Sequence, residues 1–136
     1  MSDTSPVVET RVALTVEDYE SALRFYRDAL GLPVIEAWGT ERGSGAILGA
    51  GRATIEILST AQSRYVEEIE AGGGDPDPVR LALEVHDSTS TAETLAAAGA
   101  KRLADPIVTP WSHRNVRLRA PDGLQLTLFT VLGADA

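Results

Sequence analysis

The segment that decides the fold occurs twice: residues 12–18 read VALTVED and residues 81–87 read LALEVHD, an offset of 69 positions. In both copies, apolar residues alternate with polar or small ones up to an aspartate. This pattern is typical of a half-buried strand that leads into a helix N-cap. An amphipathic stretch follows each aspartate and ends at a glycine, Gly31 in the first copy and Gly99 in the second. Two copies of one supersecondary unit predict a pseudo-symmetric domain whose halves face each other across a shared site.

Three short strands are expected after each helix. In the first copy, the pattern predicts strands at about 34–38, 46–49 and 53–59, with the sequence GSG at 43–45 as one of the turns. In the second copy, the last strand is expected at 124–132, after a Pro-Asp-Gly turn. The predicted fold class is therefore α+β. It consists of two βαβββ modules with pseudo-two-fold symmetry, whose mixed sheets curl into a cup with the helices outside.

Glycine and proline mark the predicted boundaries. We expect a disordered tail over residues 1–6, a first module over 7–60, a linker over 61–78 and a second module over 79–132. A short helical segment is expected at 65–71 within the linker. All of this fits a single domain, because domains commonly contain about 100–150 residues.

Composition excludes several classes of protein. The 136 residues include no cysteine, which rules out disulfides and thiolate metal sites. A net charge of −8 repels phosphate backbones and anionic lipids, so neither a nucleic acid nor a membrane is an expected partner. No apolar run approaches the ~20 residues that cross a bilayer, and nothing resembles a signal region. We therefore expect a cytoplasmic protein.

Four of the predicted strands have one apolar and one more polar face. The apolar positions must pack against the helices, since side chains alternate along a strand. If the opposite faces of the two sheets curl toward each other, they line a cup. The predicted inward positions are Arg11, Ala13, Thr15, Thr54, Glu56, Leu58, Arg80, Ala82, Glu84, Gln125, Thr127 and Phe129.

Several segments resemble a known superfamily. Residues 16–33, VEDYESALRFYRDALGLP, look like the opening of vicinal oxygen chelate proteins, which include glyoxalase I, bleomycin-resistance proteins and extradiol dioxygenases. Residues 55–58, 81–87 and 120–129 also resemble its recurring segments. The sequence TPWSHR at 109–114 is similar to one common in the bleomycin-resistance-like branch. The resemblance covers nearly the whole chain and implies the fold far more than any one function, because one fold hosts many chemistries.

The resemblance also implies where a metal would lie. Enzymes of this superfamily typically hold a divalent metal with a His, a Glu, a His and a Glu on the first, fourth, fifth and eighth strands. These positions fall on Arg11, Glu56, Arg80 and Thr127. Arginine has no lone pair to donate and repels a divalent cation. We therefore expect no metal and no cofactor.

Two interpretations of Arg11, Glu56 and Arg80 stay open. In the first, they form a buried ion-pair network that plugs a vestigial site, with Glu56 compensating one arginine and Glu84 or a backbone carbonyl satisfying the other. In the second, a spare guanidinium binds an anionic or carbonyl group of a small molecule. The two interpretations are compatible.

Aromatic residues are the other candidates. Trp38 and Trp111 flank predicted turns and could either stack on a planar ligand at the pocket rim or cover the edge of the core. His113 is expected near the mouth of the cup. Phe25 and Tyr26 have helical spacing and are expected in the core.

Three functions fit these observations. The first is a metal-free protein that sequesters an aromatic or cationic metabolite or antibiotic, as the bleomycin-resistance branch does. The second is a metal-free lyase or isomerase with Glu56 as the base, although the arginines are expected to keep Glu56 ionised and weakly basic. The third, a metal-dependent glyoxalase or dioxygenase, lacks its ligands. The predicted ligand-binding residues are Arg11, Trp38, Glu56, Arg80, Trp111, His113 and Thr127.

The expected partners are a small-molecule ligand and, by resemblance, a second copy of the chain in a homodimer. In this superfamily, cups are often completed by strand pairing between chains. The two modules could instead meet within one subunit, and the sequence leaves both arrangements open.

Overall fold

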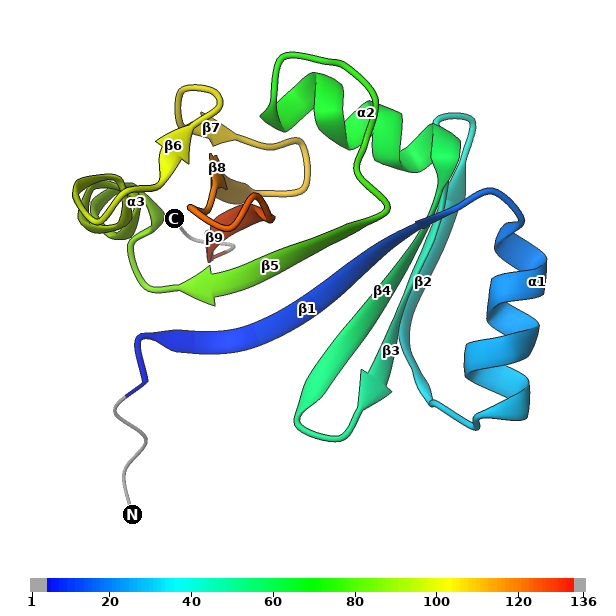
Figure 1. The fold of residues 1–136 in the computed structure, drawn as a ribbon. Coiled ribbons are helices and arrows are strands. Elements are labelled where there is room, and N and C mark those ends of the chain that lie inside the picture. Colours follow the sequence, from blue (N-terminus) through cyan, green and yellow to red (C-terminus); the bar gives the residue numbers. More distant parts are fainter. Residues whose placement is uncertain (1–4, 134–136) are drawn as a thin grey trace.

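The computed structural model describes residues 5–133 (Figure 1). Most of the predicted disordered tail, residues 1–4, lies outside this range. The first module contains β1 (Val7–Val16), α1 (Tyr19–Leu23), the π-helix η1 (Arg24–Ala29), β2 (Val34–Thr40), β3 (Gly43–Ala50) and β4 (Ala53–Ser59). After α2 (Thr60–Glu70), the second contains β5 (Val79–Val85), α3 (Ser88–Ala97), β6 (Lys101–Arg102), β7 (Ile107–Val108), β8 (His113–Arg119) and β9 (Gln125–Val131).

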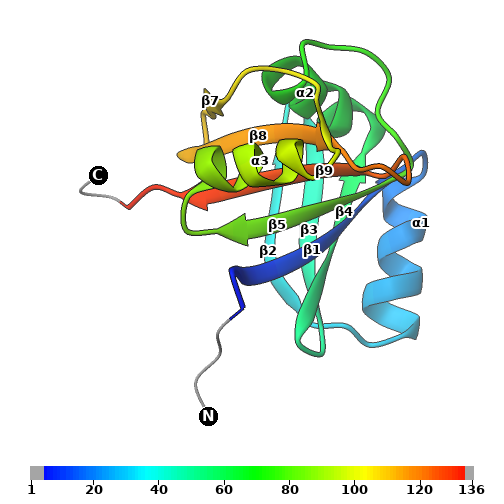
Figure 2. The same cartoon turned by 60° about the vertical axis from the view of Figure 1, so that its left-hand side comes forward.

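All the strands belong to one curled sheet. Their order is β2-β3-β4-β1-β5-β9-β8-β6, and β7 pairs with β8. The first strand of each module lies parallel to the last, β1 to β4 and β5 to β9. Between the modules, β1 runs antiparallel to β5 (Figure 2). The two modules thus pair within this chain, and the predicted α+β fold is confirmed.

The helix boundaries follow the predicted signals. Asp18 caps α1 by accepting a hydrogen bond from the Ser21 amide at 2.9 Å, and Asp87 caps α3 in the same way. Gly31, after η1, has a φ of 86°, a conformation that costs glycine little.

Two apolar clusters fix the outer helices to the sheet. In the first, Leu23 of α1 packs against Leu48 and Ile57. In the second, Ala92 of α3 packs against Val116 and Leu128. These residues lie on the outer face of the sheet, so the inner face is left to line the cup. None of the described helices is long and apolar enough to cross a lipid bilayer.

The π-helix changes which residues face outward. The amide of Leu30 donates to the carbonyl of Phe25, five residues earlier, at 3.0 Å. The wider turn carries Leu30 out of the apolar stripe that Tyr26 continues, and Leu30 is 62% exposed. Phe25 is 63% exposed, so its expected place in the core is wrong, whereas Tyr26 packs against the first cluster.

Helix α2 lies in the segment predicted as a linker and begins five residues before the expected helical turn. Figure 1 shows it over the concave side of the sheet, whereas α1 and α3 lie outside. Ser59 caps it by accepting a hydrogen bond from the Gln62 amide at 3.2 Å. The predicted turn at 43–45 is instead the start of β3. A Cβ at Gly43 would overlap the backbone of Gln62, so this glycine lets α2 approach the sheet.

Candidate functional site

A cavity of about 440 Å³ occupies the concave side of the sheet. Residues from the two modules and from α2 line it. Helix α2 contributes Gln62, Tyr65, Val66 and Glu70, which the sequence placed in a linker rather than in the site. All seven residues predicted to bind a ligand lie in the lining: Arg11, Trp38, Glu56, Arg80, Trp111, His113 and Thr127.

Glu56 has an unpaired carboxylate on the cavity wall. In the sheet, Ala13 of β1 lies directly between Glu56 of β4 and Arg80 of β5. Because neighbouring strands are about 4.8 Å apart, the backbones of Glu56 and Arg80 are separated by about 10 Å. Glu56 makes no hydrogen bond and no ion pair within 4.0 Å to any described residue. The predicted plug of Arg11, Glu56 and Arg80 is therefore wrong.

Arg11 is neutralised by a neighbour on its own strand. Its Nε and Nη2 atoms donate to the two carboxylate oxygens of Glu9, each at 3.1 Å. The guanidinium also lies over the ring of Phe129, 4.9 Å from the ring centroid. Such a bidentate pair holds the arginine in place, so Arg11 makes no ion pair with Glu56.

Arg80 is buried and is hydrogen-bonded to another of the aligned positions. Its Nη1 donates to Oγ1 of Thr127 at 2.7 Å, whereas Glu84 makes no contact with it and does not line the cavity. Burial lowers the pKa of Arg80, while Glu70 and Glu56 act in the opposite direction. Arginine stays protonated at ordinary pH, so Arg80 is a cation held close to several carboxylates.

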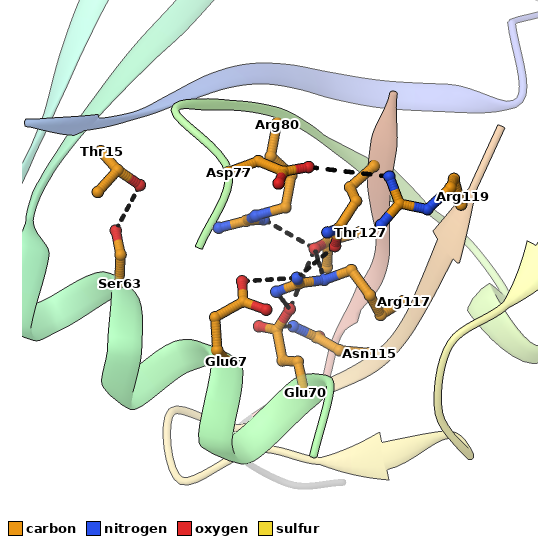
Figure 3. A network of polar contacts seen from close by, with 11 residues as sticks. Thr15, Ser63, Glu67, Glu70, Asp77, Arg80, Asn115, Arg117, Arg119 and Thr127 are labelled. Carbon is orange, nitrogen blue, oxygen red and sulfur yellow. Dashed lines mark hydrogen bonds and ion pairs between the residues drawn. The ribbon is translucent and has the colours of Figure 1, made fainter. Parts of the chain in front are cut away.

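The buried ion-pair network of the cup lies elsewhere, around Arg117 (Figure 3). Arg117 is fully buried, and its Nη1 and Nη2 atoms contact Glu67 at 2.7 Å and Glu70 at 2.9 Å. Glu70 also accepts hydrogen bonds from Asn115 at 2.8 Å and Thr127 at 3.0 Å. Although burial opposes the charge, the two carboxylates outweigh it and raise the pKa of Arg117. This network fastens α2 to the second module.

The sequence contains a signal for this network in addition to those that predicted the cup. Alternation along the strand 115–120 places Arg117 opposite the apolar Val116 and Leu118, on the face turned toward the cup. Glu67 and Glu70 are three residues apart and so share a face of a helix. The glycine-rich residues after them favoured a flexible linker and concealed the helix.

Replacing Arg117 with leucine should destabilise the protein by about 3–5 kcal/mol, because it leaves buried carboxylates without their cation. The loss should be smaller at low pH, where the carboxylates can be protonated. Denaturant unfolding at several pH values measures both effects.

Arg119→Leu is the matched control from the same strand face. Its ion pair with Asp77 is half-exposed and 4.0 Å long, and its loss should cost less than about 1 kcal/mol. Equal losses in the two variants would contradict the assigned role of Arg117.

Burial raises the pKa of Glu56 above its usual value, even though Arg80 and Arg11 act in the opposite direction. The expectation that the arginines keep Glu56 weakly basic is therefore wrong. The arginines are too far away, or too well paired, to offset the loss of solvation.

A raised pKa in the folded state makes ionisation of Glu56 destabilising. This cost is absent below the pKa of the unfolded chain, grows as the pH rises between the two pKa values, and is complete above the pKa of the folded protein. Glu56→Gln should therefore have a higher melting temperature than the parent at pH 7–8, and the advantage should shrink toward pH 4. Glu84→Gln, outside the cavity, is the control for the loss of one glutamate charge and should not raise the melting temperature. A Glu56→Gln variant less stable than the parent at pH 8 would contradict the assignment.

Aromatic side chains form much of the remaining wall. Tyr65 of α2 and Trp111 pack edge to face with their ring centroids 6.2 Å apart. His113 stacks on Phe129 with centroids 5.0 Å apart. Burial, together with the charge of Arg11, lowers the pKa of His113, so its ring is neutral at pH 7. Trp38 lies in the middle of β2 rather than at a strand end.

The cavity has an excess of negative charge. Among the described residues that line it and their ion-pair partners, five carboxylates face three guanidinium groups. An apolar, aromatic wall with uncompensated carboxylates is suited to a cationic ring system. The carboxylates belong to Glu9, Glu36, Glu56, Glu67 and Glu70, and the guanidinium groups to Arg11, Arg80 and Arg117.

The side chains at the superfamily's metal positions do not fit a divalent ion. Two of the four are arginines, and Arg80 donates a hydrogen bond to Thr127, which occupies a third position. Only Glu56 has the chemistry of a ligand. Within residues 5–133, no three His, Asp or Glu side chains come together in a metal-binding arrangement.

A family model of the Glyoxalase/Bleomycin resistance protein/Dioxygenase superfamily matches residues 10–128. The chain belongs to this superfamily. It is also similar to the uncharacterised protein YraH of Bacillus subtilis, with 27% identity over 126 residues, which is 90% of this chain and 97% of YraH.

Solved structures share the vicinal oxygen chelate fold. Methylmalonyl-CoA epimerase from Mycobacterium tuberculosis has a TM-score of 0.69 and 20% identity, with 100% of this chain and 97% of the epimerase covered. The hypothetical protein BH1468 from Bacillus halodurans has a TM-score of 0.67 and 15% identity, with 90% and 93% covered. At these identities, the likeness concerns the fold of the superfamily alone.

Proposed function

We propose that this protein is a metal-free binding protein that sequesters a small, planar aromatic cation in the cup between its modules. The observation that carries the proposal is the carboxyl group of Glu56, which faces an aromatic-walled cavity without a partner. A cationic ligand would supply the charge that the arginines do not. The ring system of the ligand would replace water along Trp38, Tyr65, Trp111 and Phe129.

Three acridines of similar size and different charge test the ligand class. At pH 7.5, the cation 10-methylacridinium should bind at least about tenfold more tightly than neutral acridine, a difference of ~1.4 kcal/mol, and acridine-9-carboxylate should bind most weakly. Isothermal titration calorimetry measures each affinity. Glu56→Gln should remove most of the preference for the cation, and Glu84→Gln should keep it. The proposal fails if none of the three binds saturably, or if the anion binds best.

The pH dependence has a defined sign. A cation favours ionised Glu56, whose pKa burial has raised, so its binding should release protons and its affinity should rise with pH until Glu56 is fully ionised. Burial and the charge of Arg11 lower the pKa of His113, so its protonation, which would oppose a cation, is shifted toward more acid pH. Calorimetry in buffers of different ionisation enthalpy counts the protons. Affinity that is independent of pH from 5 to 8 would remove Glu56 from the binding site.

One observation favours a second candidate, a metal-free isomerase or lyase. Since its pKa is raised, Glu56 is a better proton acceptor when ionised than an ordinary carboxylate. Arg80, two strands away, could hold the oxygen of an enolate that forms as Glu56 removes a proton from the carbon next to a carbonyl. For this candidate, NMR in D₂O should show the enzyme exchanging that hydrogen in a panel of 2-oxo acids and acyl thioesters. Glu56→Gln should abolish the exchange, and Glu84→Gln should not.

A further inference from the structure

Trp38 rests on a position that has no side chain. Trp38 of β2 and Gly45 of β3 are directly paired in the antiparallel ladder. Side chains of such a pair stand next to each other on the same face of the sheet. A Cβ built at Gly45 would overlap the indole ring, at 2.6 Å from Cε2 and 2.9 Å from Cη2. The indole therefore lies across the backbone of β3 at Gly45.

This placement decides which side of the indole a ligand can reach. One face of the ring is covered by Gly45, and Trp38 lines the cavity. The next inward residue of β3, Ile47, and the neighbour of Gly45 on β4, Leu58, line the cavity as well. The indole is thus a flat part of the cavity floor rather than a side chain that projects into the space.

We propose that Gly45 is a positioning residue of the ligand site, which keeps the indole of Trp38 flat so that its outer face is the stacking platform for the planar ring of the ligand. This inference rests on the proposed function and adds the subsite that recognises the ring. Any side chain at position 45 would push the indole off β3 and into the space that the ring needs. Gly45 itself touches no ligand and acts through Trp38.

A double-mutant cycle with 10-methylacridinium as the probe tests this inference. Gly45→Ala and Trp38→Ala should each weaken binding by about tenfold or more, because each removes the flat platform. The double variant should bind no more weakly than Trp38→Ala alone, since the methyl group has no indole left to displace. If the two losses multiply, or if Gly45→Ala binds as well as the parent, the inference is wrong.

The control and the folding check use the same region. Gly39 lies on β2, where an added Cβ would meet only Ser44 at an ordinary 3.5 Å, so Gly39→Ala should change affinity less than twofold. If Gly45→Ala alone does not fold, the overlap predicts that adding Trp38→Ala restores folding. Failure to restore it would overturn the inference.

Tryptophan fluorescence measured without ligand tests the placement of Trp38 independently of the proposed function. The chain contains two tryptophans, so Trp111→Phe leaves Trp38 as the only indole emitter. In that background, Gly45→Ala should shift the emission maximum to longer wavelength, because the displaced ring loses its packing against β3. If the parent binds no acridine but the shift occurs, the proposed function fails while the placement of Trp38 stands. An unchanged spectrum overturns the placement.

Discussion

The position of α2 over the sheet depends on the guanidinium of Arg117, which lies between the carboxylates of Glu67 and Glu70 in the interior of the cup. Burying ions is costly, and the cost is offset only where the geometry is good and the remaining hydrogen bonds are satisfied. Here Thr127 and Gln125 accept hydrogen bonds from Arg117, and the amide nitrogen of Asn115 donates to Glu70, although the Oδ1 atom of Asn115 is buried without a partner. Any other position of the helix would leave these charges buried without partners. The ion pairs of Arg117 thereby specify one placement for α2, and α2 in turn forms one wall of the cavity.

The electrostatics of the cavity follow from the spacing of strands. Arg11 finds Glu9 on its own strand, two residues away, and Arg80 finds Thr127 on the adjacent strand. Glu56 is two strands from Arg80, with only the methyl group of Ala13 between them. Of these charged groups, it is therefore the one left without a partner. An ionised carboxylate in that position lowers stability, because it is removed from water without an ion-pair partner.

Much of this could be predicted from alternation alone. A period of two placed Arg11, Glu56, Arg80 and Thr127 on one face, and the repeat of 69 positions brought the two faces together. Alternation predicts which face of the sheet a side chain occupies, but not which side chain lies beside it on the next strand. The predicted ion-pair plug was wrong because Ala13 lies between Glu56 and Arg80. This separation depends on the register between strands, which the sequence of one strand does not reveal. Phe25 failed for a different reason, since at 3.6 residues per turn it lies about 200° around the helix from Leu23 and so faces away from the apolar stripe.

The prediction of a linker over residues 61–78 failed for another reason. The glycines of this segment do mark a break in the chain, but they follow helix α2 rather than replace it. The spacing of Glu67 and Glu70 is compatible with one face of a helix, and the alternation along β8 indicates that Arg117 points inward. What no local pattern could supply is that these two segments, about 50 positions apart, meet each other. Long-range ion pairs of this kind become visible only when the register of the whole sheet is known.

A single helix facing two similar modules also breaks their symmetry. Arg11 and Arg80 are separated by the same 69 positions as the repeat, yet Arg11 is partly exposed and paired within its own strand, whereas Arg80 is buried beside the acids of α2. A bare symmetric cup would accept a guest in two equivalent poses related by the molecular axis. With α2 in place those poses are no longer equivalent. Helix α2 has thereby made the interior of a duplicated scaffold asymmetric, so that the two modules present different surroundings to the cavity.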